Sequence, residues 1–147
     1  MDISFNIFTD TATLVVFDLA SLRHRLSDTP DWWSLPEDEL DEINQGNAAF
    51  LNLGQDGVHV VEIVDNLLDY SGSVYIRVPS GRIFVGAGED VTGGDLEPDD
   101  TAAVSGRLIE MAPGSYAVRF RRDGDVISLS FVISGEFRNH VEGPVRL

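Results

Sequence analysis

Most of this chain consists of short runs in which apolar and polar residues alternate, a pattern that predicts β-strands rather than helices. The run SVYIRV places Val74, Ile76 and Val78 on one side of an extended chain. Asp123-Gly124 separates two longer runs, and both residues tolerate the positive φ angles that a two-residue hairpin turn requires. The apolar sides of the two arms are Tyr116, Val118 and Phe120 before the turn, and Ile127, Leu129, Phe131 and Ile133 after it. We therefore predict a hairpin here.

Turn residues also separate the other alternating runs. We expect residues 4–8 and 12–18 to pair around the turn TDT, and NAAFLNL to pair with VHVVEIV around GQDG. SLPEDELDEINQG instead predicts a helix, with Ser34 and Glu37 as a capping box, Pro36 in the first turn and Gly46 at the end. Residues 21–26 predict a second, shorter helix. The expected fold is an antiparallel β-sandwich of about eight strands with one or two short helices, in a single domain over residues 1–147.

The net charge of the chain indicates which kinds of molecule it can bind. The formal charge is −15 at pH 7, and all ten basic residues are arginine. Such a field repels nucleic acid and anionic membranes and speeds the encounter with a basic protein. The chain has no cysteine, and its first residues, MDISFNIFTD, lack the basic and long apolar regions of a signal peptide. We expect a cytoplasmic protein.

No motif in the chain identifies a reaction or a cofactor. SGRIFVGAGEDVTGGD lacks both the spacing and the lysine of a phosphate-binding loop. His24, His59 and His140 are far apart and lack metal-ligand spacing, and no nucleophile elbow is present. The loop EDVTGGDLEPDD, residues 89–100, carries six carboxylates and leaves calcium or small-ligand binding as an alternative. We predict that the protein is not an enzyme and holds no cofactor.

Two tryptophans precede five carboxylates within six residues in DWWSLPEDELDEI. In one interpretation Trp32 and Trp33 close the end of the sandwich, and the first acids stabilise the helix dipole. In the other, one exposed tryptophan beside carboxylates spaced at i and i+4 forms a docking site for a protein. The predicted partner-binding residues are Trp32, Trp33, Glu37, Asp38, Asp41 and Glu42, together with Asp95, Glu97, Asp99 and Asp100 of the acidic loop.

The segments VPSGRIFVGAGEDVTGGDLEP and IEMAPGSYAVRF resemble a group of small bacterial β-sandwich proteins. This group is similar to the competence-associated nuclease inhibitors and to immunity proteins of type VI secretion effectors. The resemblance covers residues 73–131, and its glycines and Pro113 are turn-forming. It implies an immunity-type protein that binds and neutralises a bacterial toxin. The acidic composition favours a basic toxin, such as a nuclease.

Overall fold

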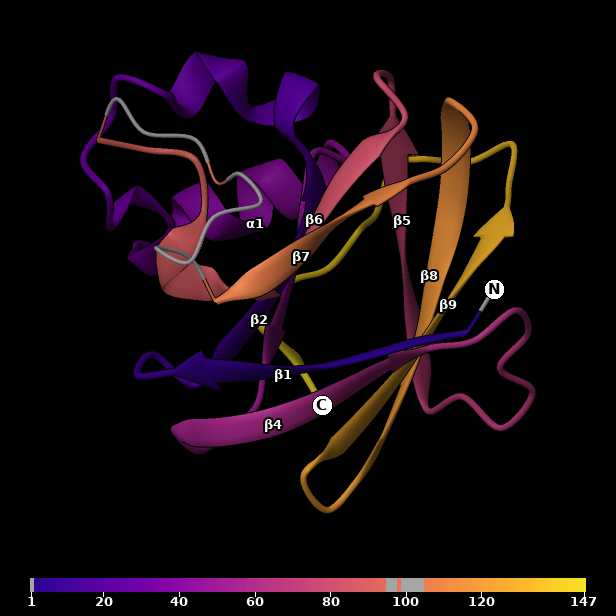
Figure 1. Cartoon of the computed structure of the whole chain (residues 1–147). Coiled ribbons are helices and arrows are strands. Elements are labelled where there is room, and N and C mark those ends of the chain that lie inside the picture. The colour runs from indigo at the N-terminus through magenta and orange to yellow at the C-terminus, as the bar shows by residue number, and fades with distance from the viewer. Residues whose placement is uncertain (1, 95–97, 99–104) are drawn as a thin grey trace.

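The computed structural model describes residues 2–94, 98 and 105–147, which form a β-sandwich with helical segments gathered at one end (Figure 1). The strands are β1 (Ile3–Thr9), β2 (Thr13–Asp18), β3 (Ala49–Asn52), β4 (Gly57–Ile63), β5 (Gly72–Val78), β6 (Arg82–Ala87), β7 (Gly106–Glu110), β8 (Gly114–Asp123), β9 (Val126–Ile133) and β10 (Val145–Arg146). The helical segments are η1 (Leu19–Arg25), η2 (Trp32–Ser34), α1 (Pro36–Asn44) and η3 (Gly88–Asp90). The predicted β-sandwich with few helices is confirmed.

The strands are arranged in two sheets of five. Sheet A has the order β1-β4-β9-β8-β5, and sheet B has the order β10-β3-β2-β6-β7. Most neighbouring strands are antiparallel, but β4 pairs with β9 in parallel and β10 pairs with β3 in parallel. The sandwich is therefore mixed, where the sequence pattern led us to expect purely antiparallel sheets.

The hairpin expected at Asp123-Gly124 is confirmed, because β8 and β9 pair as far as Asp123 and Val126. Its two turn residues are Gly124, with a φ of 61°, and Asp125, one position later than expected. The pairs expected around TDT and GQDG are wrong. β1 and β2 lie in different sheets, as do β3 and β4. Alternation decides which side of a strand is buried but not which strand lies beside it, and these two turns connect the layers instead of closing hairpins.

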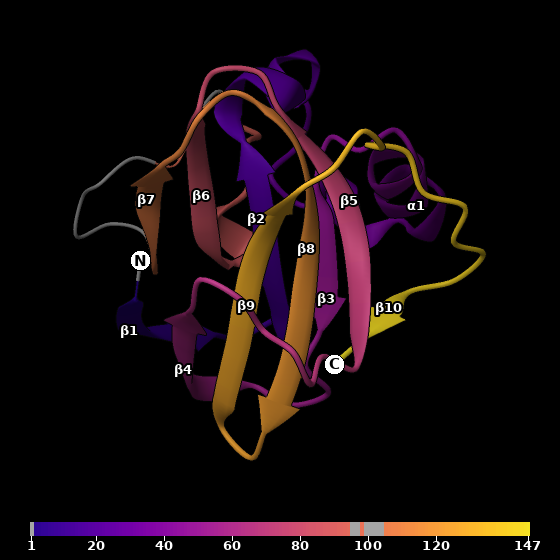
Figure 2. The same cartoon turned by 90° about the vertical axis from the view of Figure 1, so that its right-hand side faces the viewer.

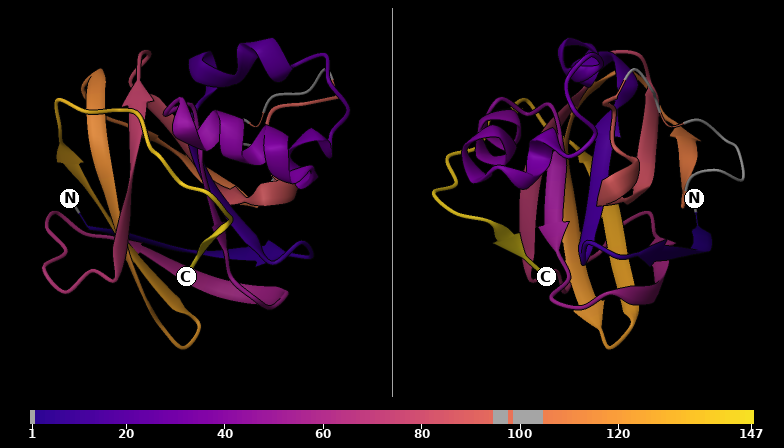
Figure 3. Two further views of the ribbon diagram at one scale, coloured as in Figure 1. Left: turned by 180° about the vertical axis from the view of Figure 1, so that it is seen from behind. Right: turned by 90° about the vertical axis from the view of Figure 1, so that its left-hand side faces the viewer.

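Most of the predicted apolar sides of the strands form the core between the sheets, but at the end of β9 Phe131 is only half-buried and Ile133 is 80% exposed. Val74, Ile76 and Val78 of β5 are buried, as are the corresponding residues of β8. β2 is buried along its whole length. It is the central strand of sheet B, with sheet A on one side and the helical segments near the other (Figure 3). An uninterrupted apolar run such as TLVVF suits a strand that is covered on both faces.

The helix predicted over SLPEDELDEINQG is present as α1, but the capping box is wrong. Leu35 occupies the N-cap position and makes no side-chain capping bond. Ser34 ends η2, and its hydroxyl donates to the Asp31 carbonyl oxygen over 2.7 Å. Pro36 takes the first helical position, as expected, and Gly46 follows the helix with a φ of 76°.

Residues 134–147 form a strap along the open edge of β5 and across α1 (Figure 3). The Asn139 amide donates to the carbonyl oxygens of Tyr75 and Ile43, each over 2.8 Å, and accepts from the Tyr75 amide over 2.9 Å. Asn44 of α1 holds Val141 through both backbone groups. The strap therefore pairs both backbone groups of Tyr75 at the edge of sheet A, where an uncovered strand could pair with another chain.

The outer side of sheet A is partly covered as well. Residues 64–71, between β4 and β5, cross the outer side of β9 and β8 (Figure 2), and Leu67 in this segment is buried. The Arg119 guanidinium lies 4.6 Å from the centre of the Tyr70 ring. Ser128 and Ser130 lie on this polar side of β9 and are buried.

Candidate partner-binding surface

Trp32 and Trp33 both pack against one core residue, Phe50 of β3. The Trp33 ring stacks on Phe50 at 5.6 Å and 11°, whereas Trp32 meets the same ring edge-on at 5.9 Å and 86°. Only 3% of Trp32 and 7% of Trp33 is exposed. The interpretation that requires one exposed indole is wrong, because the tight turn of η2 lets both neighbouring side chains pack against a single aromatic ring.

Arg25 joins three carboxylates, one from the segment after η1 and two from α1. Its Nε donates to Glu42 over 3.1 Å, Nη1 to Asp28 over 3.1 Å, and Nη2 to Asp38 over 3.3 Å. The guanidinium also lies 4.5 Å from the centre of the Trp32 ring. Despite the burial of Arg25, which works to lower its pKa, its hydrogen bonds to these acids raise the pKa. This cation holds η1, η2 and α1 together.

Glu42 is the centre of this network and is only 1% exposed. Besides Arg25, its carboxylate lies 2.7 Å from His24 Nε2 and accepts from the Asn47 side-chain amide over 2.9 Å. Asn47 in turn accepts from Arg77 Nε over 2.7 Å. Glu42 and Asp38 were predicted to contact a partner, but in the folded chain they are engaged by its own cations.

The two carboxylate pairs predicted at i and i+4 on α1 therefore point in different directions. Asp38 and Glu42 turn inward to Arg25, whereas Glu37 and Asp41 are exposed. Asp41 accepts a hydrogen bond from Gln45 over 2.9 Å. Residues four apart share a face of a helix, so the two pairs of carboxylates on the nine-residue α1 lie on different faces, one inward and one toward solvent.

We define the acidic helical surface as four exposed residues: Asp31 directly before η2, Leu35 between η2 and α1, and Glu37 and Asp41 on α1. Leu35 is a large apolar side chain that remains 55% exposed. Within the described ranges, none of these three carboxylates forms an ion pair with an arginine or a histidine. Nearby, burial raises the pKa of Glu39. The surface thus combines unpaired negative charge with one apolar anchor.

The acidic loop begins beside this helical segment. Trp32 Nε1 donates to the Thr92 carbonyl oxygen over 2.7 Å, and the Gly94 amide donates to the Asp28 carbonyl oxygen over 2.7 Å. The two acidic stretches of the sequence therefore meet in space at Gly94, a contact that no local pattern could indicate. The predicted contact residues Asp95, Glu97, Asp99 and Asp100 lie outside the residues that the structure describes.

The first two acids of the loop are held by the β1–β2 turn and by Ser105. Glu89 accepts hydrogen bonds from the Thr9 and Thr11 hydroxyls and from the Asp10 amide, at 2.7 to 2.8 Å. Burial works to raise the pKa of Glu89, but these hydrogen bonds outweigh it and lower the pKa, while the contact with Glu89 raises the pKa of Asp10. Asp90 accepts from the Ser105 amide over 2.7 Å. These contacts tie both flanks of the loop to the sandwich.

The sequence also raised the histidines and the acidic loop as possible metal ligands. His59 is buried, with Nε2 3.3 Å from the Gln55 carbonyl oxygen. Across residues 2–94, 98 and 105–147, no group of three or more histidine or carboxylate side chains is arranged to hold a metal ion. Four of the six carboxylates in the calcium alternative fall outside those ranges, so that alternative stays a prediction. Nor is any helix described there long and apolar enough to cross a bilayer.

Comparisons with known proteins agree with this architecture. The family model described as "Family of unknown function (DUF6386)" matches residues 1–147. No curated protein matches the chain. Among solved structures, "Crocagin biosynthetic gene J" aligns with a TM-score of 0.54 and 13% identity, covering 90% of this chain and 96% of that one.

A second solved structure is ComJ of Bacillus subtilis, described as an inhibitor of the DNA-degrading activity of NucA. It aligns with a TM-score of 0.52 and 12% identity, covering 91% of this chain and 99% of ComJ. At identities this low, the two structural alignments show a shared fold alone. At the level of fold, the predicted resemblance to competence-associated nuclease inhibitors is confirmed.

Proposed function

We propose that this chain, which belongs to the family DUF6386, is an immunity-type inhibitor that binds a cationic protein through the acidic helical surface. The first candidate for its target is a bacterial nuclease, since ComJ, which shares the fold, inhibits one. In this proposal the protein acts in the cytoplasm by occupying the target and performs no reaction itself.

The observation that carries the proposal is a set of unpaired carboxylates on a rigid base. Glu37 and Asp41 lie one helical turn apart and are exposed beside Leu35, while Arg25 and Phe50 lock the segment beneath them. A surface that is already ordered loses little side-chain and backbone freedom when a partner binds. Complementary charge then accelerates the encounter and favours cationic partners over others.

The tryptophans and inward acids take a supporting part in this proposal. Trp32, Trp33, Asp38 and Glu42 position the acidic helical surface and do not touch the partner. Nucleases carry basic grooves for the phosphates of DNA, whose duplex has one charge per ~1.7 Å of axis. Carboxylates spaced by one helical turn of ~5.4 Å can occupy part of such a groove. We include Asp95, Glu97, Asp99 and Asp100 in the proposed contact, because the chain enters that stretch beside Asp28.

An inhibition assay tests this proposal. A nuclease encoded beside the gene for this protein, where the genome carries one, is incubated with labelled duplex DNA, and the rate of cleavage is measured against inhibitor concentration. We expect stoichiometric inhibition that weakens as salt rises, because the encounter is steered by charge. A cleavage rate unaffected by excess of this protein would contradict an inhibitory role for that pair.

Charge reversal locates the surface. The double variant Glu37→Lys with Asp41→Lys should weaken inhibition by about tenfold or more, mainly through a slower association rate. The control is Asp56→Lys with Asp125→Lys, which makes the same change of charge at exposed positions beside β4 and the tip of the β8–β9 hairpin. If both double variants weaken inhibition equally, the net charge and not this surface is responsible, and the assignment fails.

A further inference from the structure

Each sheet of the sandwich has two edge strands, and three of these four edges are protected against pairing with another chain. Sheet A ends in β1 and β5, and sheet B ends in β10 and β7. The strap runs along β5 (Figure 3), β10 has only two residues, and β7 carries the exposed charges of Arg107 and Glu110. Covering segments, short strands and charged side chains are the usual means by which proteins protect a sheet edge.

The fourth edge, β1, has none of these protections within the part of the chain that the structure describes. The strand is seven residues long, ISFNIFT, and contains neither a charged residue nor a proline, although the chain has twenty-five acids. It pairs with β4 in one unbroken register from Ile3 to Thr9, so no bulge turns the edge away from a neighbour. β1 is therefore an open template for a further strand.

One contact shows which backbone groups of β1 point away from β4. The Phe8 amide donates to the Ser105 hydroxyl over 2.6 Å, so the Phe8 N–H points away from β4. In an antiparallel pair, residues two apart direct their backbone groups the same way. The N–H and C=O groups of Ser4 and Asn6 therefore also point away from β4. Both residues are exposed, and among the described residues nothing pairs with these backbone groups.

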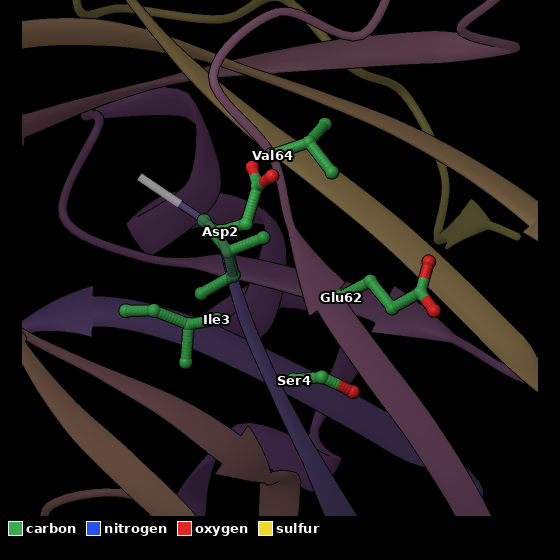
Figure 4. A pocket seen from close by; sticks show the side chains of 6 residues that line it. Asp2, Ile3, Ser4, Glu62 and Val64 are labelled. Atoms are coloured by element: carbon green, nitrogen blue, oxygen red, sulfur yellow. The ribbon is translucent and has the colours of Figure 1, made fainter.

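The side chains of β1 divide into a polar outer side and an apolar inner side. Ser4 and Asn6 lie on the outer side of sheet A. In Figure 4 Ser4 and the opposite Glu62 point to one side of the two strands and Ile3 points to the other. The inner side carries Ile3, Phe5 and Ile7. A strand added at this edge must continue both sides, and β1 itself has the required pattern.

We propose that the chain forms a homodimer in which β1 pairs with β1 of a second copy, antiparallel and centred on Phe5. Ser105 selects this register, because it occupies the Phe8 N–H and leaves Ser4 and Asn6 free. Ser4 of each copy would exchange backbone hydrogen bonds with Asn6 of the other. The two Phe5 rings would lie opposite each other on the inner side, where aromatic pairs stabilise a sheet. The two copies of sheet A would become one continuous sheet.

The uncharged edge favours a second copy of this chain over a basic partner. A basic segment is attracted by carboxylates, and β1 has none between Ile3 and Thr9. Two chains of charge −15 repel each other, and an edge without charge keeps that repulsion lowest at the contact. Added salt should therefore strengthen the homodimer, whereas it should weaken the binding of a cationic target. The homodimer does not depend on the proposed function, and the start of β1 lies on the side away from α1 (Figure 1).

Sedimentation equilibrium of the full chain tests the homodimer. We expect the average mass to rise from that of one chain toward that of two between about 10 µM and about 1 mM, the range of a small, reversible interface. The rise should begin at lower concentration in about 0.5 M than in about 0.05 M sodium chloride. The mass of a single chain throughout this range, at both salt concentrations, would overturn the proposal.

Hydrogen exchange followed by NMR locates the contact without a substitution. The amides of Phe5 and Ile7 point toward β4 and should be protected at every concentration. The amides of Ser4 and Asn6 should exchange about fivefold more slowly, or slower still, in concentrated than in dilute solution. If the mass rises while these two amides are unaffected, or if the slowing occurs at Leu108 of β7 instead, the assignment to β1 is wrong.

A proline substitution then tests the backbone pairing. Asn6→Pro removes an N–H that points away from β4, a position at which an edge strand accepts proline. Because one N–H is lost from each copy, the dissociation constant of the homodimer should rise about tenfold or more. Asn6→Ala is the matched control, since it shortens the same side chain but keeps the N–H, and it should dimerise within about threefold of the parent. Dimerisation of Asn6→Pro equal to that of the parent, or an equal loss in both variants, would refute pairing through this backbone; the exchange measurement decides the matter if Asn6→Pro does not fold.

Discussion

Glu42→Gln is the sharpest test of the network beneath the acidic helical surface. The substitution preserves the shape of the side chain but replaces one carboxylate oxygen by an NH2 group. In the folded chain one oxygen faces Arg25 and the other faces the Asn47 amide, and His24 Nε2 is within 2.9 Å of both. Whichever way the new amide turns, its NH2 group opposes a donor.

The expected cost follows from these contacts. Loss of a hydrogen bond to a charged group costs about 1.5–3 kcal/mol, and a buried donor left without an acceptor costs about 1–3 kcal/mol. Arg25 keeps Asp28 and Asp38 as partners, so it is not left unpaired in the variant. We therefore expect a loss of about 3 kcal/mol, which corresponds to a fall in Tm of about 6–12 °C for a chain of this size.

Urea unfolding followed by tryptophan fluorescence measures this loss. The chain has two tryptophans, Trp32 and Trp33, and both lie beside the network, so the signal reports on the affected region. Asp41→Asn is the matched control, because Asp41 is exposed on the same helix, and it should stay within about 0.5 kcal/mol of the parent. If Glu42→Gln were as stable as this control, the view of Glu42 as the structural centre would be refuted.

Three further outcomes are expected. Phe50→Ala removes the ring that both indoles contact and should cost about 3–5 kcal/mol by urea unfolding, with the tryptophan emission shifted to the red. Gly46→Ala should cost more than about 1 kcal/mol and speed hydrogen exchange in the strap, since φ is +76° and the added Cβ would meet the Phe137 carbonyl oxygen at 1.9 Å. Because the pKa of Glu89 is lowered on folding, its contribution is present above the ordinary glutamate pKa and lost as pH falls. In an Asp10→Asn background, stability should therefore decline more steeply between about pH 5 and pH 3 with Glu89 than with Glu89→Gln.

The sequence predicted which side of each strand is buried better than it predicted strand pairing. Val74 and Ile76 face the core as expected, because alternation is a local property of an extended chain. Pairing depends on how the layers pack, and the turns TDT and GQDG connect strands of different sheets instead of closing hairpins. The hairpin at Asp123-Gly124 was correctly predicted because glycine at this position favours a tight turn, although the turn itself is formed by Gly124 and Asp125.

The acidic segment shows a similar limit. Its charge and its helix were evident from the residues themselves, but the division between inward and outward acids depends on Arg25, which precedes α1 by eleven positions. The burial of Trp32 and Trp33 depends on Phe50, which lies beyond α1 in the next strand. Neither contact can be predicted from the residues next to it in the sequence. Leu35 was missed as an exposed anchor, although its position directly before Pro36 placed it at the helix boundary.

The alternation of the chain between its two sheets has a mechanical consequence. Five of the nine connections between successive strands pass from one sheet to the other, and β4 pairs with a strand that follows it by more than sixty residues. Because the backbone passes repeatedly between the two sheets, neither sheet can unfold while the other stays folded. We expect slow, cooperative folding, because the long loops must close before the central strands gain their neighbours.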